Sequence, residues 1–171
     1  MVRICTRDDA QAIYAIVNEA AVAYKGHIPD DCYAEPYMSW AELVEEMASM
    51  TFYGWEEGGA LLGVMGYQPV QDVTLVRHAY VLPDHQGRGI GSALLAHTER
   101  LTTTSRLLVG TWADATWAVG FYQRRGFRLL PDKDNLLRRY WTVSERQREV
   151  SVVLGKELAR PSSAVPGGLF P

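Results

Sequence analysis

Apolar residues follow two periods along this chain, and together they predict alternating strands and helices. Runs rich in β-branched and aromatic residues predict strands, whereas apolar residues at every third or fourth position predict helices. The predicted strands cover residues 2–5, 52–56, 60–67, 73–81, 106–111 and 150–154, with another short strand beginning at 126–127. The first predicted helix begins at residue 6 or 8 and ends near residue 26. Further helices are predicted over 39–47, 90–101 and 114–125, and residues 132–141 form a short amphipathic helix or an ordered loop. This alternation indicates an α/β protein that contains a parallel neighbour or a crossover connection.

Capping and turn residues mark several boundaries of these elements. Ser39 and Glu42 have the spacing of a capping box at the start of a helix. The Gly58-Gly59 pair lies between two apolar runs and predicts a β-hairpin, because glycine takes the positive φ angles of a tight turn. Gly126 stands where a left-handed helix C-cap belongs.

The segment 25–38 has two prolines and no clear period, so we interpret it as a loop. It is richer in titratable and aromatic residues than a connector needs, and the substrate could bind there. In the helix that follows, we expect the paired Glu45 and Glu46 to be solvated.

The most informative stretch is the strand 73–81, the loop after it and the helix 90–101. The loop contains Gln86-Gly87-Arg88-Gly89-Ile90-Gly91, with three glycines at alternate positions directly before the helix. Glycines let the backbone approach a ligand closely, while the unpaired N–H groups of the first helical turn point at it. The stretch therefore predicts an anion site, for a phosphate or pyrophosphate.

Two common nucleotide-binding motifs do not fit this loop. A P-loop ends in Gly-Lys-Ser/Thr, but Gly91 is followed by Ser92 and Ala93. A dinucleotide-binding loop needs the spacing G-x-G-x-x-G and an acidic residue after the next strand, but the spacing here is G-x-G-x-G and the next strand ends in Gly110-Thr111-Trp112. Nucleoside triphosphatases and dinucleotide enzymes are therefore disfavoured.

Composition narrows the class further. The chain has 171 residues, 47% of them hydrophobic and 22% charged, which suits one globular domain over residues 1–158 followed by a flexible Pro/Gly/Ser-rich tail over 159–171. A net charge of −3 argues against a general nucleic-acid or anionic-membrane binder. No apolar run approaches the ~20 residues of a membrane span, and the charged N-terminus lacks the apolar region of a signal peptide, so we expect a cytoplasmic protein. Cys5 and Cys32 lack metal-ligand spacing and are expected to be reduced thiols.

Two motifs together resemble a known family. Gln86-x-x-Gly89-x-Gly91 after a strand resembles the cofactor loop of the GNAT superfamily of acyl-CoA-dependent N-acetyltransferases. The second signature of that family, a helix ending in Phe-Tyr and followed by Gly-Phe, has its match in residues 121–127, FYQRRGF. The order and spacing of the two motifs agree with the family over roughly residues 73–130.

The resemblance implies a fold and a cosubstrate. The fold is a mixed sheet of about six to seven strands, splayed between the fourth and fifth, with helices on both faces. The cosubstrate is acetyl-CoA, and no metal is expected. Its pyrophosphate would bind the loop, with Gln86 and Arg88 as further donors, and its pantetheine arm would pair with the strand edge near Val81. The implied cofactor-binding residues are Val81, Gln86, Gly87, Arg88, Gly89, Ile90, Gly91 and Ser92.

The resemblance also implies an acid, and leaves the base open. Tyr122 matches the family's general acid, which protonates the leaving thiolate. The position on the central strand where several members carry an acidic or histidine base is Leu75, which cannot accept a proton. Strict alternation places Arg77 and Ala79 on the face of Leu75, and His78 with Val76 and Tyr80 on the other face. His78 is therefore interpreted as a structural histidine.

The remaining candidates for the base lie in the early loop: His27, Asp30, Asp31 and Glu35, acting directly or through water. Glu35 is the first choice as a hypothesis.

Two functions of different class follow. The first is an enzyme that moves an acetyl group from acetyl-CoA to a primary amine of a small molecule or peptide, by direct attack in a ternary complex. The second is a non-catalytic acyl-CoA sensor or structural module, suggested by the missing strand base and by Ala115, where many members carry an Asn. The acceptor pocket would be lined by the early loop, the hairpin and the side chains of Arg77, Tyr80, Trp112 and Trp141, and would suit an apolar or planar amine. Dimers are frequent in families of this type, and the sequence leaves the oligomeric state open.

Overall fold

A computed structural model describes residues 1–159 of the chain, so the predicted tail lies outside the described residues apart from Ala159. Seven strands form one sheet in the order β1-β2-β3-β4-β5-β7-β6. Their bounds are β1 Val2–Ile4, β2 Thr51–Glu57, β3 Ala60–Val70, β4 Val73–Val81, β5 Arg106–Trp112, β6 Arg128–Leu129 and β7 Ser151–Glu157. Only the pairing of β4 with β5 is parallel. The predicted mixed sheet is therefore confirmed.

Six α-helices connect and cover the strands: α1 Ala10–Ala21, α2 Trp40–Ser49, α3 Ile90–Leu101, α4 Thr116–Gln123, α5 Lys133–Tyr140 and α6 Glu145–Glu149. A 3-10 turn, Val22–Tyr24, extends α1. The Ser39 hydroxyl caps α2 by accepting from the amide of Glu42 at 3.1 Å. Segment 132–141 is a helix rather than a loop, and α6 was not predicted. No helix among residues 1–159 is long and apolar enough to cross a membrane.

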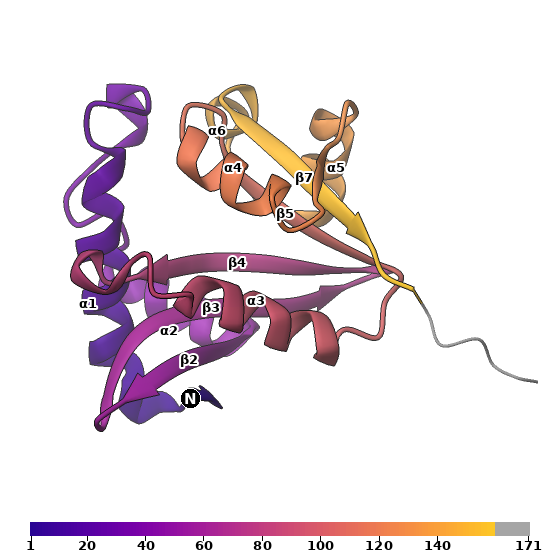
Figure 1. Ribbon diagram of the computed structural model, residues 1–171. Helices are drawn as coiled ribbons and strands as arrows, with labels where there is room; N and C mark the ends of the chain where they lie inside the picture. The colour runs from indigo at the N-terminus through magenta and orange to yellow at the C-terminus, as the bar shows by residue number, and fades with distance from the viewer. Residues whose placement is uncertain (160–171) are drawn as a thin grey trace, which may run out of the picture.

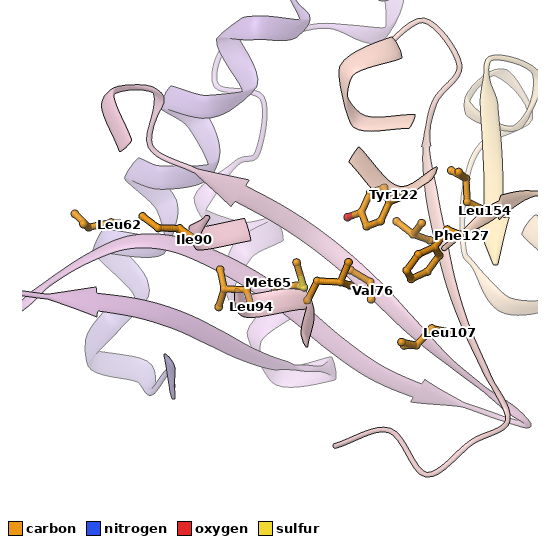
Figure 2. Packing of buried hydrophobic residues seen from close by; sticks show 11 residues of the cluster. Leu62, Met65, Val76, Ile90, Leu94, Leu107, Tyr122, Phe127 and Leu154 are labelled. Atoms are coloured by element: carbon orange, nitrogen blue, oxygen red, sulfur yellow. The ribbon is translucent and has the colours of Figure 1, made fainter. Parts of the chain in front are cut away.

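Neighbouring strand residues point into different core clusters, which places helices on both faces of the sheet. Leu75 packs with Leu136 and Leu137 of α5, whereas its neighbour Val76 packs with Leu94 of α3. Figure 2 shows the second cluster, in which side chains of α3, β3, β4, β5 and β7 meet Tyr122 at the end of α4. The helices α1 and α2 pack on β2 and β3 through a third cluster.

The sheet opens between β4 and β5. These strands pair only where Thr74–Val76 face Leu107–Val109, and beyond that point they diverge (Figure 1). β5 continues to pair with β7 as far as Trp112, so the unpaired strand edge belongs to β4 from Arg77 to Val81. The predicted splay is confirmed, and it leaves a slot between the two halves of the sheet.

A β-bulge at His78 changes which β4 side chains face which layer. The pairs Gly66–Arg77 and Val64–Tyr80 leave two β4 residues opposite one residue of β3, and His78 has a φ of +47°. After the bulge, Tyr80 packs with the α1–α2 cluster and Ala79 with the α3 cluster. The prediction from strict alternation, which put Ala79 with Leu75 and Tyr80 with Val76, is therefore wrong.

Candidate active site

The glycine loop is shaped as an anion cradle at the start of α3. Gly87 and Gly89 have φ angles of +76° and +82°, in the left-handed region that favours glycine. Gly89 is the N-cap of α3, and no side chain among residues 1–159 caps this helix. The amides of Ile90, Gly91 and Ser92 therefore have no intrahelical partner and remain free to bind a phosphate at the positive end of the helix dipole.

A cavity of about 900 Å³ runs from this loop along the β4–β5 slot to α1 and α4. Seven of the eight predicted cofactor-binding residues line it: Val81, Gln86, Gly87, Gly89, Ile90, Gly91 and Ser92. Its volume lies within the range of sites that bind small molecules and cofactors. The cavity has the volume and the anion cradle that a nucleotide with a flexible arm needs.

Two polar side chains of the loop have partners within the protein. The Gln86 side-chain amide donates to the carbonyl of Val81 at 3.1 Å, which holds the loop against the end of β4. Arg88 does not line the cavity. Its guanidinium donates to Glu57 at 2.8 Å and contacts Nδ1 of His85 at 2.8 Å. The roles of Gln86 and Arg88 as phosphate donors stay predictions.

The sequence did not single out two arginines that also line the large cavity, Arg124 and Arg125. Nε of Arg125 donates to the Ser92 hydroxyl at 3.0 Å, and its guanidinium lies 3.7 Å from the centre of the Phe121 ring. Burial and the neighbouring charge of Arg124 lower the pKa of Arg125. No carboxylate among residues 1–159 forms an ion pair with either arginine, so both can meet an anionic ligand.

Tyr122, the predicted acid, lies at the wall of the same cavity. Its ring packs edge-on against Phe121 and Phe127, and Figure 2 shows its hydroxyl oxygen on the side away from Phe127. The Tyr122 hydroxyl has no hydrogen bond to a described residue. Among residues 1–159, every fully buried polar side-chain atom has a hydrogen-bond partner, so this hydroxyl is not fully buried and faces the cavity that Tyr122 lines. Burial raises the pKa of Tyr122, which keeps the phenol protonated.

A second, smaller cavity of about 160 Å³ shares the β4–β5 slot with the first. Arg77, Tyr80, Trp112 and Trp141, predicted for the acceptor pocket, all line it. The early loop contributes Tyr37, but no residue of the 51–70 hairpin lines this cavity, contrary to expectation. A large cofactor-sized cavity and a small aromatic one therefore share lining residues at the slot between the diverging strands.

The aromatic groups of the smaller cavity form a neutral network. The Trp112 indole donates to the Tyr37 hydroxyl at 2.8 Å, and the Tyr24 hydroxyl donates to that of Tyr80 at 3.4 Å. Burial raises the pKa of Tyr24, Tyr37 and Tyr80, so all three phenols are uncharged near neutral pH.

None of the three acidic candidates for the base lines either cavity. Glu35 is exposed, accepts from the Tyr33 hydroxyl at 3.0 Å and lies 3.5 Å from Nζ of Lys25. Asp31 forms an ion pair with Arg146 at 2.8 Å, and this hydrogen bond lowers the pKa of Asp31. Asp30 lies in the same exposed loop. The structure therefore gives the Glu35 hypothesis no support.

Three histidines do line the large cavity: His27, His78 and His85, the last of which contacts Arg88. His27 packs edge-on against Trp117 with ring centres 5.3 Å apart. His78 lies 2.7 Å from Oε2 of Glu46. Glu46 is a half-buried residue that also pairs with Arg77 at 3.1 Å, so the prediction that it is solvated is wrong.

Known structures share this fold. PaiA N-acetyltransferase from Thermoplasma acidophilum, solved with coenzyme A, is 15% identical with a TM-score of 0.72, and the alignment covers 92% of this chain and 98% of that one. The ribosomal-protein-S18-alanine N-acetyltransferase from Escherichia coli is 18% identical with a TM-score of 0.69, over 96% and 97% of the two chains. A GNAT-family acetyltransferase from Staphylococcus aureus Mu50 is 14% identical with a TM-score of 0.70, over 93% and 99%.

The sequence itself matches one family model. The acetyltransferase (GNAT) family model covers residues 11–127, which include α1, the glycine loop and the Phe-Tyr/Gly-Phe signature. No curated protein matches the sequence in the corresponding comparison.

Proposed function

The chain belongs to the acetyltransferase (GNAT) family, and from this premise we propose that it transfers the acetyl group of acetyl-CoA to the primary amine of a small molecule bound in the aromatic cavity. The observation that carries the proposal is the slot between β4 and β5, where the cofactor-sized cavity and the aromatic cavity share lining residues. Acetyl donor and amine can meet there in one ternary complex. Family membership supports turnover over the alternative of a non-catalytic acyl-CoA-binding module.

The residues present fit acetyl-CoA as the donor. The uncapped N-terminus of α3 and the backbone of Gly87 and Gly89 would hold the pyrophosphate, with Arg124 and Arg125 adding positive charge. The unpaired edge of β4 beyond Val76 offers backbone groups to the amides of the arm, as an added strand would. Gln86 already occupies the carbonyl of Val81, so the arm would bind the other free groups of this edge.

Acetyl-CoA supplies an acetyl group on a thiolate leaving group. The amine nitrogen attacks the acetyl carbon, the C–N bond forms, the C–S bond breaks, and the sulfur takes a proton while the nitrogen loses one. We assign the proton donor to Tyr122, whose hydroxyl faces the cavity in its protonated form. The apolar surroundings that raise the pKa of this phenol would also raise the proton affinity of a thiolate formed beside it, so the two effects oppose each other in the transfer.

The aromatic cavity favours a compact, ring-bearing amine. An engineered protein cavity of about 150 Å³ binds benzene, and this cavity, of about 160 Å³, is walled by tyrosines and tryptophans that can stack on a ring. The charge of Arg77 is matched by Glu46, so the described residues that line this cavity leave no unpaired cation for an acidic acceptor. A peptide acceptor would have to fit its terminal residue into the same volume.

An amine panel tests the proposed function. Purified protein with acetyl-CoA is given ring amines such as benzylamine and phenethylamine, and separately lysine, glutamate and an Ala-terminated peptide, and free CoA thiol is measured together with N-acetylated product. We expect the ring amines to have the highest kcat/KM, and Trp141→Ala to raise their KM without changing the Kd for acetyl-CoA. Equal kcat/KM for glutamate and the ring amines would contradict the proposed acceptor class.

A cytoplasmic location and a dimer stay predictions.

A further inference from the structure

The slot where the two cavities meet contains one group suited to move a proton at neutral pH. Seven residues line both cavities: Tyr24, Val76, Arg77, His78, Tyr80, Gly110 and Thr111. Burial raises the pKa of both tyrosines, and an arginine does not deprotonate in proteins. Among these shared residues, only His78 has a side chain whose ordinary pKa lies near 6.5.

The β-bulge brings His78 to this place. Strict alternation would point it into the α3 layer with Val76, but the extra residue and the φ of +47° turn its side chain toward α2 and Phe52, with ring centres 6.0 Å apart. A histidine at positive φ is unusual, since most side chains avoid this region. The bulge lies at the first residues of β4 beyond its pairing with β5, where the slot opens.

Glu46 fixes the tautomer of the imidazole. Burial acts to raise the pKa of Glu46, but the hydrogen bond to His78 and the charges of His78 and Arg77 outweigh it and lower the pKa, so the group is a carboxylate. A carboxylate only accepts, so Nε2 of His78, at 2.7 Å, carries the hydrogen and donates. The lone pair of a neutral His78 is then on Nδ1, and the carboxylate stabilises the imidazolium formed when Nδ1 takes a proton.

We propose that His78 is the general base of the acetyl transfer and that Glu46 positions it. Nδ1 takes the proton that the amine nitrogen loses as its C–N bond to the acetyl group forms, and the thiolate sulfur receives its proton from Tyr122, which lines the same large cavity. Charges and protons balance, because one proton leaves the nitrogen and one reaches the sulfur. This assignment rests on the proposed acetyl transfer and deepens it.

The groups around the imidazole set what a pH profile can show. Glu46 of α2 contacts the imidazole, Arg77 pairs with the same carboxylate, and the three tyrosines of the aromatic cavity stay neutral. The amine substrate also titrates. Measuring the pH profile of kcat/KM with two ring amines of different pKa separates the two contributions. The part of the profile that reports the amine shifts with the amine's pKa, whereas the part that reports an enzyme group stays at the same pH.

The test measures kcat/KM for the amine against pH at saturating acetyl-CoA, with wild type, His78→Gln and Glu46→Gln. The matched control is His97→Gln, because His97 packs on Tyr53 and lines neither cavity. We expect His78→Gln to lower kcat/KM by about 10²- to 10⁴-fold. The variant should also lack the substrate-independent limb, which is the fall of kcat/KM at low pH whose midpoint is the same for both amines. Added imidazole should restore part of the activity of His78→Ala, and Glu46→Gln should move the limb to lower pH, because the imidazolium loses its anion.

The Kd for acetyl-CoA should stay unchanged in His78→Gln, Glu46→Gln and the control. A His78→Gln enzyme that keeps the substrate-independent limb would overturn the assignment, and so would a Glu46→Gln enzyme with an unmoved limb. A wild-type protein that acetylates no amine overturns the proposed function instead, and the two failures are thereby distinguished.

Discussion

Replacing Tyr122 with Phe separates a catalytic role of this residue from a structural one. The substitution removes one oxygen from a ring that is 4% exposed and packed between Phe121 and Phe127. Because the hydroxyl donates to no described residue, the folded protein loses no hydrogen bond within residues 1–159. We therefore expect kcat to fall while stability and cofactor affinity are kept.

The magnitude follows from the proton transfer alone. A positioned general acid contributes about 10²- to 10⁴-fold, which corresponds to about 3–5 kcal/mol of barrier at about 1.4 kcal/mol per tenfold change. The change in the free energy of unfolding should stay below about 1 kcal/mol, since shape and packing are retained and no hydrogen bond is broken.

The assay follows CoA thiol release with the best ring amine, and urea unfolding is measured beside it. The control is Tyr140→Phe, whose hydroxyl donates to Asp72 at 2.6 Å and lies outside both cavities. The control should lose stability and keep kcat, the reverse of Tyr122→Phe. A Tyr122→Phe enzyme with wild-type kcat would refute the assignment of the acid.

Three further substitutions test the glycine loop, the core under the slot and an ion pair near the N-terminus. Gly89→Ala should cost about 1–2 kcal/mol in urea unfolding and raise the Kd for CoA in calorimetry, because φ is +82° while a Cβ there would meet no atom within 4 Å. Leu94→Ala should lower the free energy of unfolding by about 3 kcal/mol, since the side chain is 0% exposed in the core under the slot; a loss below about 1 kcal/mol would mean that this core is loosely packed. The hydrogen bond from Arg3 lowers the pKa of Asp9 from 3.8 to about 2, so the carboxylate stabilises the fold above about pH 4 and this stabilisation is lost as the pH falls toward 2. The difference in unfolding free energy between wild type and Asp9→Asn should therefore shrink between about pH 5 and pH 2, and a constant difference would contradict the ion pair.

Local chemistry explains which elements could be predicted. The strands 73–81 and 106–111 and the helix 90–101 have long, consistent periods, and the structure places β4, β5 and α3 there. The five residues of α6, ERQRE, are all polar and have no apolar period. Only the capping box of Ser144 and Gln147 could have indicated this helix.

The parts of the site that were missed depend on contacts between distant segments. The bulge at His78 is set by how β4 pairs with β3, and its residues alone read as a regular strand. Glu46 is 32 residues from His78 in sequence, and Ser92 is 33 residues from Arg125. The glycine loop could be predicted because its geometry depends on adjacent residues. Strict alternation placed His78 on the face of Val76, so the contact of its imidazole with Glu46 could not be predicted from the strand alone.

The most direct test of the account is an initial-rate study of CoA thiol release with acetyl-CoA and the best ring amine varied together. Direct attack in a ternary complex predicts intersecting double-reciprocal lines, with one N-acetylated amine formed for each thiol released. Parallel lines would contradict direct transfer, and tight CoA binding without thiol release on any amine of the panel would contradict acetyl transfer itself.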